Sequence, residues 1–229
     1  MSTQKRKYEL KARAENLQRT RERIVEATMQ LHEEVGPART TVAEVARRAG
    51  VQRLTVYNHF PEDEDLFRAC GGHWLSLHPS PDVSPALAAD EPEARVRQAL
   101  SAFYGWYREN RSMIVPIQRD RNLIPALDKV VTEMTDEPLG QLADALAHGF
   151  GDGARAVAPR RALIRLALDF WTWRRLALEG LDDLQAACLM ADAIARASQA
   201  ASALREPSPD ARRGGLATGT RLRPEERRH

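Results

Sequence analysis

The chain has 229 residues, 43% of them hydrophobic and 29% charged, a balance typical of a globular protein with room for a small and a medium-sized domain. No apolar run approaches the roughly 20 residues that a membrane helix requires, and the charged start lacks the apolar core of a signal peptide, so we expect a cytoplasmic protein with no membrane partner. The only cysteines, Cys70 and Cys188, are far apart, which excludes a disulfide framework and a zinc finger.

Charge is distributed unevenly along the chain. Residues 1–60 hold twelve Lys/Arg against seven Asp/Glu, residues 205–229 hold seven against four, and the stretch between them is acidic. A basic front end on an acidic body is typical of a protein whose N-terminus meets a polyanion such as DNA. Ordinary solvated surface helices remain the alternative explanation.

The first elements are a basic arm and a helix. Residues 1–17 are polar and basic, and they form either a frayed arm or a helical extension. From about Gln18 an apolar stripe recurs every three to four residues and stops at Gly36-Pro37, which predicts the first helix. Its core face is formed by Ile24, Ala27, Thr28, Leu31 and Val35.

The next segment has the parts of a helix-turn-helix. Thr41 precedes an apolar-periodic stretch and Glu44 follows three residues later, the spacing of a capping box, so a second helix should span about 42–49. Gly50 can adopt the positive φ of a tight turn, and a third helix should follow over about 52–59. In DNA-binding proteins the second helix of such a pair lies in the major groove.

The rest of the chain shows only helical periodicity. Further helices are expected at about 62–77, 92–110, 112–119, 123–149 with an interruption at Pro138, 160–179 and 182–204. The proline-rich stretch 79–92 is expected to be a loop, Gly149, Gly151 and Gly153 a flexible loop, and the tail 206–229 disordered. The sequence therefore predicts an all-α protein: an arm at 1–17, a three-helix helix-turn-helix DNA-binding domain at 18–61, and a helical ligand-binding and dimerisation domain at 62–205.

The third helix carries an unusual concentration of hydrogen-bonding side chains. Arg53, Thr55, Tyr57, Asn58 and His59 fall within seven residues. All of them can bind phosphate oxygens, and Arg53 and Asn58 also suit base edges.

The run from Thr40 to Pro61 closely resembles the helix-turn-helix of the tetracycline-repressor (TetR) family, and the Thr-x-Tyr-x-His-Phe segment that ends at Phe60 is its most specific part. The resemblance covers about residues 18–70, with a weaker similarity over 168–190. It implies that Thr41, Tyr57 and His59 hold phosphates. It also implies that bases or sugar edges face Gln52, Arg53, Leu54, Thr55 and Asn58.

Two positions depart from the family pattern. Leu54 stands where many members have glycine or proline, and we expect it to contact a thymine methyl group in this chain. Asp63, within an acidic run from Glu62 to Asp65, stands where members often have a phosphate-binding lysine. We expect weaker anchoring there, with compensation from the basic arm if that arm contacts DNA; a merely solubilising arm is the alternative.

The resemblance further implies a homodimer and an effector pocket. The helices at 160–179 and 182–204, joined by Gly180-Leu181, carry apolar residues on more than one face and are expected to pair with a second copy, unless they are simply buried within one chain. The residues expected to bind a small hydrophobic or aromatic effector, with plain core packing as the alternative, are Phe103, Trp106, Tyr107, Met113, Ile117 and Trp171. Gly71-Gly72 marks either a bend or a close helix contact.

These features predict a ligand-responsive regulator, a repressor that binds a palindromic DNA operator as a dimer and releases it when the effector binds. An activator or an effector-independent DNA-binding protein of the same fold remains open, and an enzyme is the remote alternative. No phosphate-binding glycine loop, nucleophile elbow or Cys/His metal spacing is present in the sequence. We expect no cofactor and no metal; a metal site formed by His73, His78 and His148 is a remote alternative to ordinary solvated or core histidines.

Overall fold

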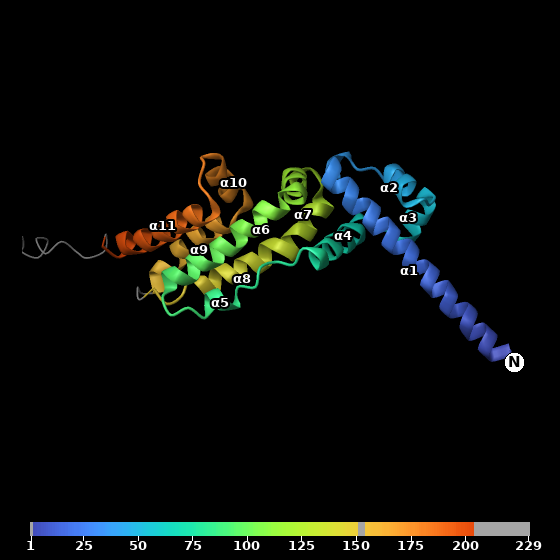
Figure 1. The fold of residues 1–229 in the computed structure, drawn as a ribbon, viewed down its shortest axis with the longest axis horizontal. Coiled ribbons are helices and arrows are strands. Elements are labelled where there is room, and N and C mark those ends of the chain that lie inside the picture. The colour runs from blue at the N-terminus through green and yellow to red at the C-terminus, as the bar shows by residue number, and fades with distance from the viewer. Residues whose placement is uncertain (1, 151–153, 204–229) are drawn as a thin grey trace, which may run out of the picture.

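The computed structural model describes residues 2–150 and 154–203, and every regular element within these ranges is helical (Figure 1). The all-α prediction is therefore confirmed. Gly151, Gly153 and the tail 206–229 lie outside the described residues. The helices are α1 Ser2–Glu34, α2 Val42–Ala49, α3 Arg53–His59, α4 Asp63–Leu77, α5 Ser84–Leu87, α6 Pro92–Asp120, α7 Pro125–Val131, α8 Glu137–Leu146, α9 Ala154–Leu168, α10 Phe170–Leu178 and α11 Asp183–Ala203.

The N-terminal domain packs α1, α2 and α3 around a small apolar core, with α4 alongside. The core-facing stripe predicted for the first helix is buried except at Val35, which is exposed beyond the end of α1. The buried residues of this core are Ile24, Val25, Ala27, Leu31, Val45, Ala46, Ala49, Val56 and Phe60.

The basic arm continues α1 as a helix and projects away from the rest of the molecule (Figure 1). Of the two forms left open for residues 1–17, the structure has the helical extension. Lys7, Lys11 and Arg13 are exposed on it, as are Tyr8 and Leu17. An α-helix is about 10–12 Å wide with its side chains, and the minor groove is about 6 Å wide, so the extension cannot enter a minor groove in this conformation.

The C-terminal domain is built on α6, against which α11 makes the largest helix contact. The sequence predicted two helices here, at 92–110 and 112–119, and that prediction is wrong because α6 runs unbroken from Pro92 to Asp120. Pro116 lies inside it and is buried. A proline there removes one main-chain hydrogen bond, and burial of α6 against its neighbours keeps the helix continuous despite this loss.

The predicted interruption at Pro138 takes the form of a π-helical turn, Thr132–Asp136, rather than a break. The main-chain N–H of Glu137 donates to the carbonyl of Thr132, five residues earlier, and α8 begins there with Pro138 in its first turn. The wider turn accommodates the proline without ending the helical path. Turns of this kind are frequent at functional sites.

The helix predicted over 160–179 is two helices, because the chain is extended at Asp169 between α9 and α10. The Asp169 carboxylate accepts hydrogen bonds from the main-chain N–H groups of Trp171 (2.8 Å) and Thr172 (3.1 Å), so it caps α10. On the other side of the break, the hydroxyls of Tyr104 and Tyr107 donate to the carbonyls of Ala167 (2.8 Å) and Leu168 (2.6 Å). The α9 carbonyls are thereby satisfied without a longer helix.

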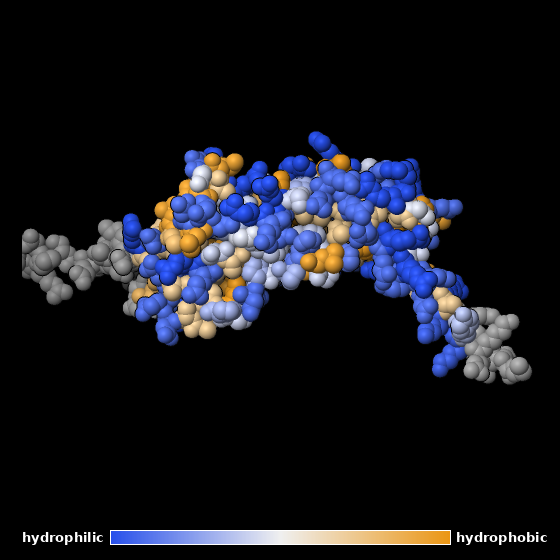
Figure 2. Space-filling model, in the orientation of Figure 1, coloured by the Kyte–Doolittle hydropathy of each residue, from blue (hydrophilic) through white to orange (hydrophobic). Residues whose placement is uncertain are grey.

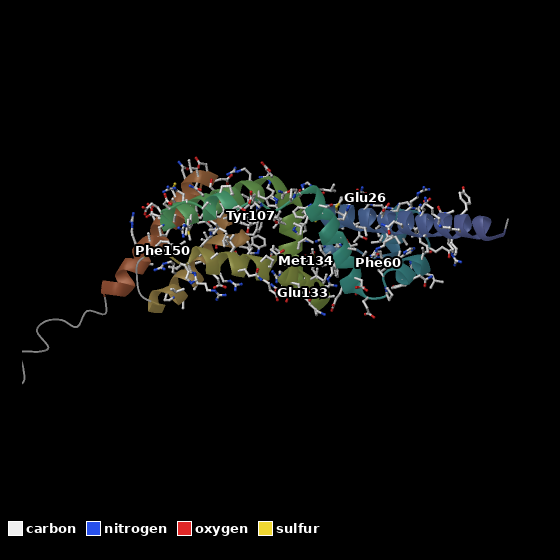
Figure 3. The ribbon with its side chains drawn as sticks, turned by 90° about the horizontal axis from the view of Figure 1, so that it is seen from below. Glu26, Phe60, Tyr107, Glu133, Met134 and Phe150 are labelled. Atoms are coloured by element: carbon white, nitrogen blue, oxygen red, sulfur yellow. The ribbon has the colours of Figure 1, made fainter. Side chains whose placement is uncertain are left out.

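Two sets of contacts join the domains. At the end of α6, the buried Asp120 carboxylate accepts from the main-chain N–H of Ala38 (3.0 Å), in the turn that follows α1. On α4, Arg68 pairs with Glu133 at 2.6 Å (Figure 3). The end of α1 and the helix α4 are thus held directly by α6 and by the π-helical turn.

Candidate nucleic-acid interface and ligand cavity

The orientation of α3 is fixed by the helix and turn before it. The Thr41 hydroxyl accepts from the main-chain N–H of Glu44 (3.2 Å), which confirms one half of the predicted capping box. The other half is absent from the described contacts, because the Glu44 carboxylate accepts instead from Arg47 Nε (3.0 Å). Gly50 ends α2 at φ 66°, the left-handed conformation predicted for it, and α3 begins three residues later.

The polar side chains predicted to contact DNA lie largely on the outer face of α3. Val56 is turned into the core, whereas Thr55 and His59 are half-buried. The remaining candidates are exposed: Thr41, Gln52, Arg53, Leu54, Tyr57 and Asn58. A single surface therefore displays one guanidinium, two carboxamides and a phenol, together with the apolar side chain of Leu54.

Arg21 of α1 fixes the C-terminal end of α3, a role that the sequence analysis did not assign. Its guanidinium donates to the main-chain carbonyl of His59 (3.3 Å) and lies 4.1 Å from the centre of the Phe60 ring. A cation near the last carbonyls of a helix is stabilising, and the contact with the aromatic ring adds to this. Arg21 therefore holds Tyr57 and His59 at a constant position relative to α1.

The acidic start of α4 is partly neutralised by the C-terminal domain. Lys129 pairs with Glu64 at 2.6 Å, and this hydrogen bond raises the pKa of Lys129. The Asp65 carboxylate lies 3.9 Å from Arg68. Glu62 and Asp63 are exposed and belong to the first turn and its cap, where negative charge favours the helix. Asp63 stands where the resembling family often has a phosphate-binding lysine. In this chain its negative charge stabilises α4 instead.

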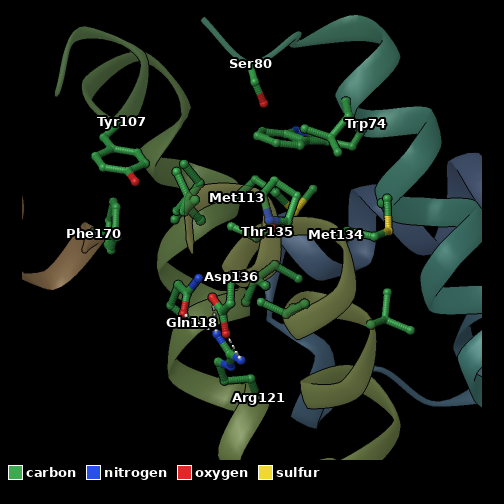
Figure 4. A pocket seen from close by; sticks show the side chains of 18 of the residues that line it. Trp74, Ser80, Tyr107, Met113, Gln118, Arg121, Met134, Thr135, Asp136 and Phe170 are labelled. Atoms are coloured by element: carbon green, nitrogen blue, oxygen red, sulfur yellow. Dashed lines mark hydrogen bonds and ion pairs between the residues drawn. The ribbon is translucent and has the colours of Figure 1, made fainter. Parts of the chain in front are cut away.

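A cavity of about 340 Å³ lies in the C-terminal domain, between α4, α6, the π-helical turn, α8 and the start of α10 (Figure 4). Five of the six residues predicted to form an effector pocket line it. They are Phe103, Trp106, Tyr107, Met113 and Ile117. These five lie on one face of α6, which runs unbroken where the sequence predicted two helices.

Trp171 is not among the residues that line this cavity, and its assignment there is corrected. It is 42% exposed on α10, and the neighbouring Phe170 lines the cavity instead. The prediction assumed an unbroken helix through Asp169. Because the chain is extended at that residue, α10 starts afresh and its first buried position is Phe170.

The cavity also reaches α1 and α4, although the sequence analysis assigned no residue of these helices to it. His32 of α1 and the α4 residues Phe67, Cys70, Gly71 and Trp74 line it. At Gly71 an added Cβ would lie 3.4 Å from the Met134 sulfur, an ordinary van der Waals distance, and at Gly72 it would meet no atom within 4 Å, so close packing does not explain the glycine pair. The helix α4 is continuous there.

Burial leaves the His32 and Cys70 side chains uncharged. Desolvation lowers the pKa of His32 to about 4, against a weaker opposing effect of Asp120, and it raises the pKa of Cys70 to about 12. The two side chains lie 3.8 Å apart, and the His32 ring stacks on Phe67. The DNA-side wall of the cavity is therefore neutral at physiological pH.

The cavity wall also holds a polar cluster around Arg121 (Figure 4). Asp136 and Asp128 each accept from this guanidinium at 2.7 Å, and these bonds raise its pKa. The Thr132 hydroxyl accepts at 3.1 Å and the Gln118 carbonyl at 3.4 Å. The cluster joins α6, α7 and the π-helical turn.

Neither a metal site nor a membrane helix is found in the part of the chain that the structure describes. No three His, Cys, Asp or Glu side chains there are grouped as metal ligands. His73 lies 3.3 Å from Glu26, His78 stacks on Trp74, and His148 contacts the carbonyl of Asp144. Of the helices within residues 2–150 and 154–203, none combines the length and hydropathy needed to cross a bilayer.

The residues that form the helix-turn-helix match the model of a known family. Residues 24–70 match the model of bacterial regulatory proteins, tetR family. The N-terminal domain of this chain therefore resembles the DNA-binding region of that family. The two curated relatives are transcriptional regulators, and the matched regions span somewhat less than half of their own lengths.

The similarity of this chain to individual proteins is modest. It is 25% identical over 141 residues to the uncharacterized HTH-type transcriptional regulator YerO of Bacillus subtilis, covering 58% of this chain and 47% of that protein. It is 32% identical over 83 residues to the HTH-type transcriptional regulator BetI of Burkholderia thailandensis, covering 36% and 43%.

Solved structures show that the fold extends beyond the N-terminal domain. A TetR-like transcriptional regulator from Rhodococcus sp. RHA1 gives a TM-score of 0.54 at 18% identity, covering 79% of this chain and 96% of that one. The fatty acid degradation regulator FadR from Bacillus halodurans gives 0.54 at 18% identity, covering 77% and 94%. At this level of identity the likeness establishes the fold alone.

Proposed function

We propose that this chain is a transcription regulator that binds a palindromic DNA operator as a homodimer, represses from it, and releases it when a small hydrophobic or aromatic effector enters the cavity. The observation that carries the DNA-binding part is the outer face of α3. Its exposed Arg53, Tyr57 and Asn58 project from a helix-turn-helix that matches the tetR-family model. Such side chains on a second helix suit base edges and phosphates in a major groove.

Individual roles follow from side-chain chemistry. Arg53 and Asn58 have the fork geometries that bind purine edges in a bidentate manner, and the exposed Leu54 is suited to a thymine methyl group. The hydroxyls of Thr41 and Tyr57, and the His59 ring, are assigned to phosphates. Gln52 and Thr55 are assigned to bases or sugar edges, and the exposed lysines and arginines of the α1 extension to backbone phosphates outside the central site.

Selection of bound duplexes from a random pool tests this interface. Arg53→Ala should relax the preference at one base position, at a cost of about 1–3 kcal/mol, because it removes a base contact. Tyr57→Phe should weaken binding evenly across sequences, since only a phosphate bond is lost. Arg111→Ala, which removes an exposed arginine of α6, serves as the control. Unchanged binding by both α3 variants would refute the assignment.

The proposed dimer surface lies on α9, α10 and α11. Large apolar side chains are exposed there, and Figure 2 shows hydrophobic residues gathered over this end of the molecule. Exposed apolar patches of this kind are typical of interaction sites. The side chains concerned are Leu166, Trp171, Leu178, Leu184 and Leu189.

Sedimentation of the full chain tests the dimer. Leu178 is 69% exposed, so Leu178→Glu should leave the fold intact and shift the protein toward monomer. Leu123→Glu, on a similarly exposed leucine outside this surface, is the matched control. A wild-type protein that sediments as a monomer at micromolar concentration would contradict the dimer, and with it a palindromic operator whose half-sites lie roughly 34–36 Å apart.

The proposed ligand response rests on the position of the cavity. Its walls include α1 and α4, which also carry the DNA-binding domain, so a ligand that contacts them differently in two states can change the setting of α3. Operator affinity measured with and without a cavity-bound compound tests this step. Affinity that stays constant while the cavity is occupied would favour the effector-independent alternative. The position of the operator relative to the promoter decides between repressor and activator.

A further inference from the structure

The cationic group in the cavity wall is already fully engaged by protein partners. Arg121 Nε donates to Asp128 (2.7 Å), and its two terminal nitrogens reach Asp136 at 2.7 and 3.2 Å. The remaining N–H directions are taken by Thr132 and Gln118. A guanidinium has five N–H donors, and these five contacts account for them. Arg121 therefore has no donor left to bind a carboxylate or phosphate of a ligand.

The other ionisable groups in the wall also disfavour an anion. His32 is neutral because burial lowers its pKa to about 4. The remaining ionisable carboxyls are Asp136, paired with Arg121, and Asp169, which caps α10. An anionic ligand would lose its hydration on entry and meet carboxylates in place of a counter-charge, which is strongly unfavourable.

One buried donor in the wall lacks a partner. Trp106 lines the cavity, and its indole Nε1 is buried without an acceptor among the described residues. A buried donor left unpaired costs free energy, so it usually has a partner that is missing from the protein itself. The nearby Tyr107 hydroxyl cannot serve a ligand in the same way, because it already donates to the Leu168 carbonyl.

The surroundings of Trp106 are aromatic. Its ring contacts the rings of Trp74, Phe103 and Tyr107 at centre-to-centre distances of 5.6, 6.5 and 5.7 Å. Phe170 stands edge-on to Tyr107 and also lines the cavity. Rings in these arrangements favour a flat aromatic ligand through edge-to-face and offset contacts.

We propose that the cavity binds an uncharged aromatic molecule whose hydrogen-bond acceptor, such as a carbonyl or ether oxygen, accepts from Trp106 Nε1, and that it excludes the corresponding carboxylate. This inference rests on the proposed effector site and names the chemical class of its ligand. Arg121 has a positioning role: it holds the π-helical turn against α6 and does not bind the ligand.

Four probes of similar shape test the proposal by calorimetric titration of the full chain: methyl naphthoate, methylnaphthalene, the naphthoate anion and the N-methylquinolinium cation. The ester should bind roughly three- to tenfold more tightly than the hydrocarbon, because it supplies the acceptor. It should bind on the order of a hundredfold more tightly than the anion. Equal or tighter binding of the anion or the cation would overturn the proposal, as would a failure of the ester to bind.

Two variants identify the donor. Trp106→Phe keeps an aromatic ring but removes the N–H, so the ester should lose its advantage over methylnaphthalene while the hydrocarbon binds as before. Arg111→Ala, at an exposed residue of α6 outside the cavity, should keep the advantage. An ester preference that survives Trp106→Phe would overturn the assignment of Nε1.

Operator binding measured with the same probes separates this inference from the proposed function. If the naphthoate anion releases the operator and the ester does not, the ligand class is wrong and the ligand-responsive function stands. If the ester binds with the predicted preference and operator affinity is unchanged, the ligand class stands and the proposed response fails.

Discussion

The two domains fill their interiors differently. In the N-terminal domain, short side chains and one phenylalanine form a core on which the outer face of α3 is mounted. In the C-terminal domain, large aromatic residues surround a cavity of about 340 Å³ instead of filling it. Well-packed protein interiors contain few voids larger than a water molecule. The cavity therefore costs the C-terminal domain packing contacts that the core of the N-terminal domain keeps.

This contrast separates two tasks. A surface that reads DNA must hold its side chains at fixed positions, which a filled core and the Arg21 contact with Phe60 provide. A site that accepts a ligand needs space that the protein leaves unfilled. The two regions meet at α1 and α4, whose residues belong both to the N-terminal packing and to the cavity wall.

Truncation of Phe60 should have the largest effect. Phe60→Ala removes a ring that is 3% exposed and is expected to cost about 3–5 kcal/mol of unfolding free energy. All four tryptophans lie from Trp74 onward, so their fluorescence follows the C-terminal domain, whereas far-ultraviolet circular dichroism follows both domains. We expect an earlier loss of helical signal with little change in fluorescence.

Leu54→Ala is the control for that experiment. Leu54 is 66% exposed on α3, the helix that ends just before Phe60, and its truncation should change stability by less than about 0.5 kcal/mol. If Phe60→Ala shifts circular dichroism and fluorescence by the same amount, the two domains unfold as one unit and the contrast between them has no counterpart in stability.

Enlarging one side chain in each domain should change stability by an intermediate amount. The change should be destabilising in the N-terminal domain and neutral or stabilising in the C-terminal domain. Val45→Phe adds volume to a position that is 1% exposed, and overpacking should destabilise the protein by about 1–3 kcal/mol. Ile117→Phe adds volume next to the cavity and should be neutral or stabilising by up to about 1 kcal/mol, while it weakens binding of methyl naphthoate. Thermal unfolding and titration measure both, and equal destabilisation by the two changes would show that the cavity is not available space.

The smallest predicted effect concerns the junction between the domains. Hydrogen bonds from Arg119 and from the Ala38 N–H lower the pKa of Asp120, although burial opposes the shift. The Asp120 carboxylate therefore stabilises the folded chain above its unfolded pKa, about 3.9, and this contribution is lost as the pH falls through the lower folded value. Asp120→Asn should cost about 1 kcal/mol near neutral pH.

Denaturant unfolding at several pH values measures that contribution. The difference between wild type and Asp120→Asn should be constant above about pH 5 and should narrow below about pH 4. Asp90→Asn, at an exposed aspartate remote from the junction, controls for general charge effects. A difference that stays constant down to acidic pH would show that the ionised Asp120 carboxylate does not stabilise the folded chain.

The sequence was sufficient to predict the structure where its determinants are local. Thr41 and Gly50 fix the start and end of α2, and the hydrogen-bonding side chains of α3 follow within nine residues of Gly50. The break at Asp169 could not be read in the same way, because the hydroxyls that satisfy the end of α9 come from Tyr104 and Tyr107 on α6.

The same distinction applies to the cavity. Residues on one face of α6 were recognisable from helical spacing, whereas His32 and Cys70 belong to segments whose approach to the cavity depends on the docking of the two domains. The full engagement of Arg121 is equally invisible in the sequence, since its partners lie on α7 and on a turn that Pro138 widens.

Pro116 has a consequence for the motions of α6. It has no N–H, so the Ser112 carbonyl lacks its usual main-chain donor, and the helix is weakened at that turn. Met113 and Ile117 of this turn face the cavity, while the Pro116 ring packs beside Gly36, between the domains. Amide deuterium uptake should therefore be faster here than in the preceding turns of α6 and should slow when a compound occupies the cavity.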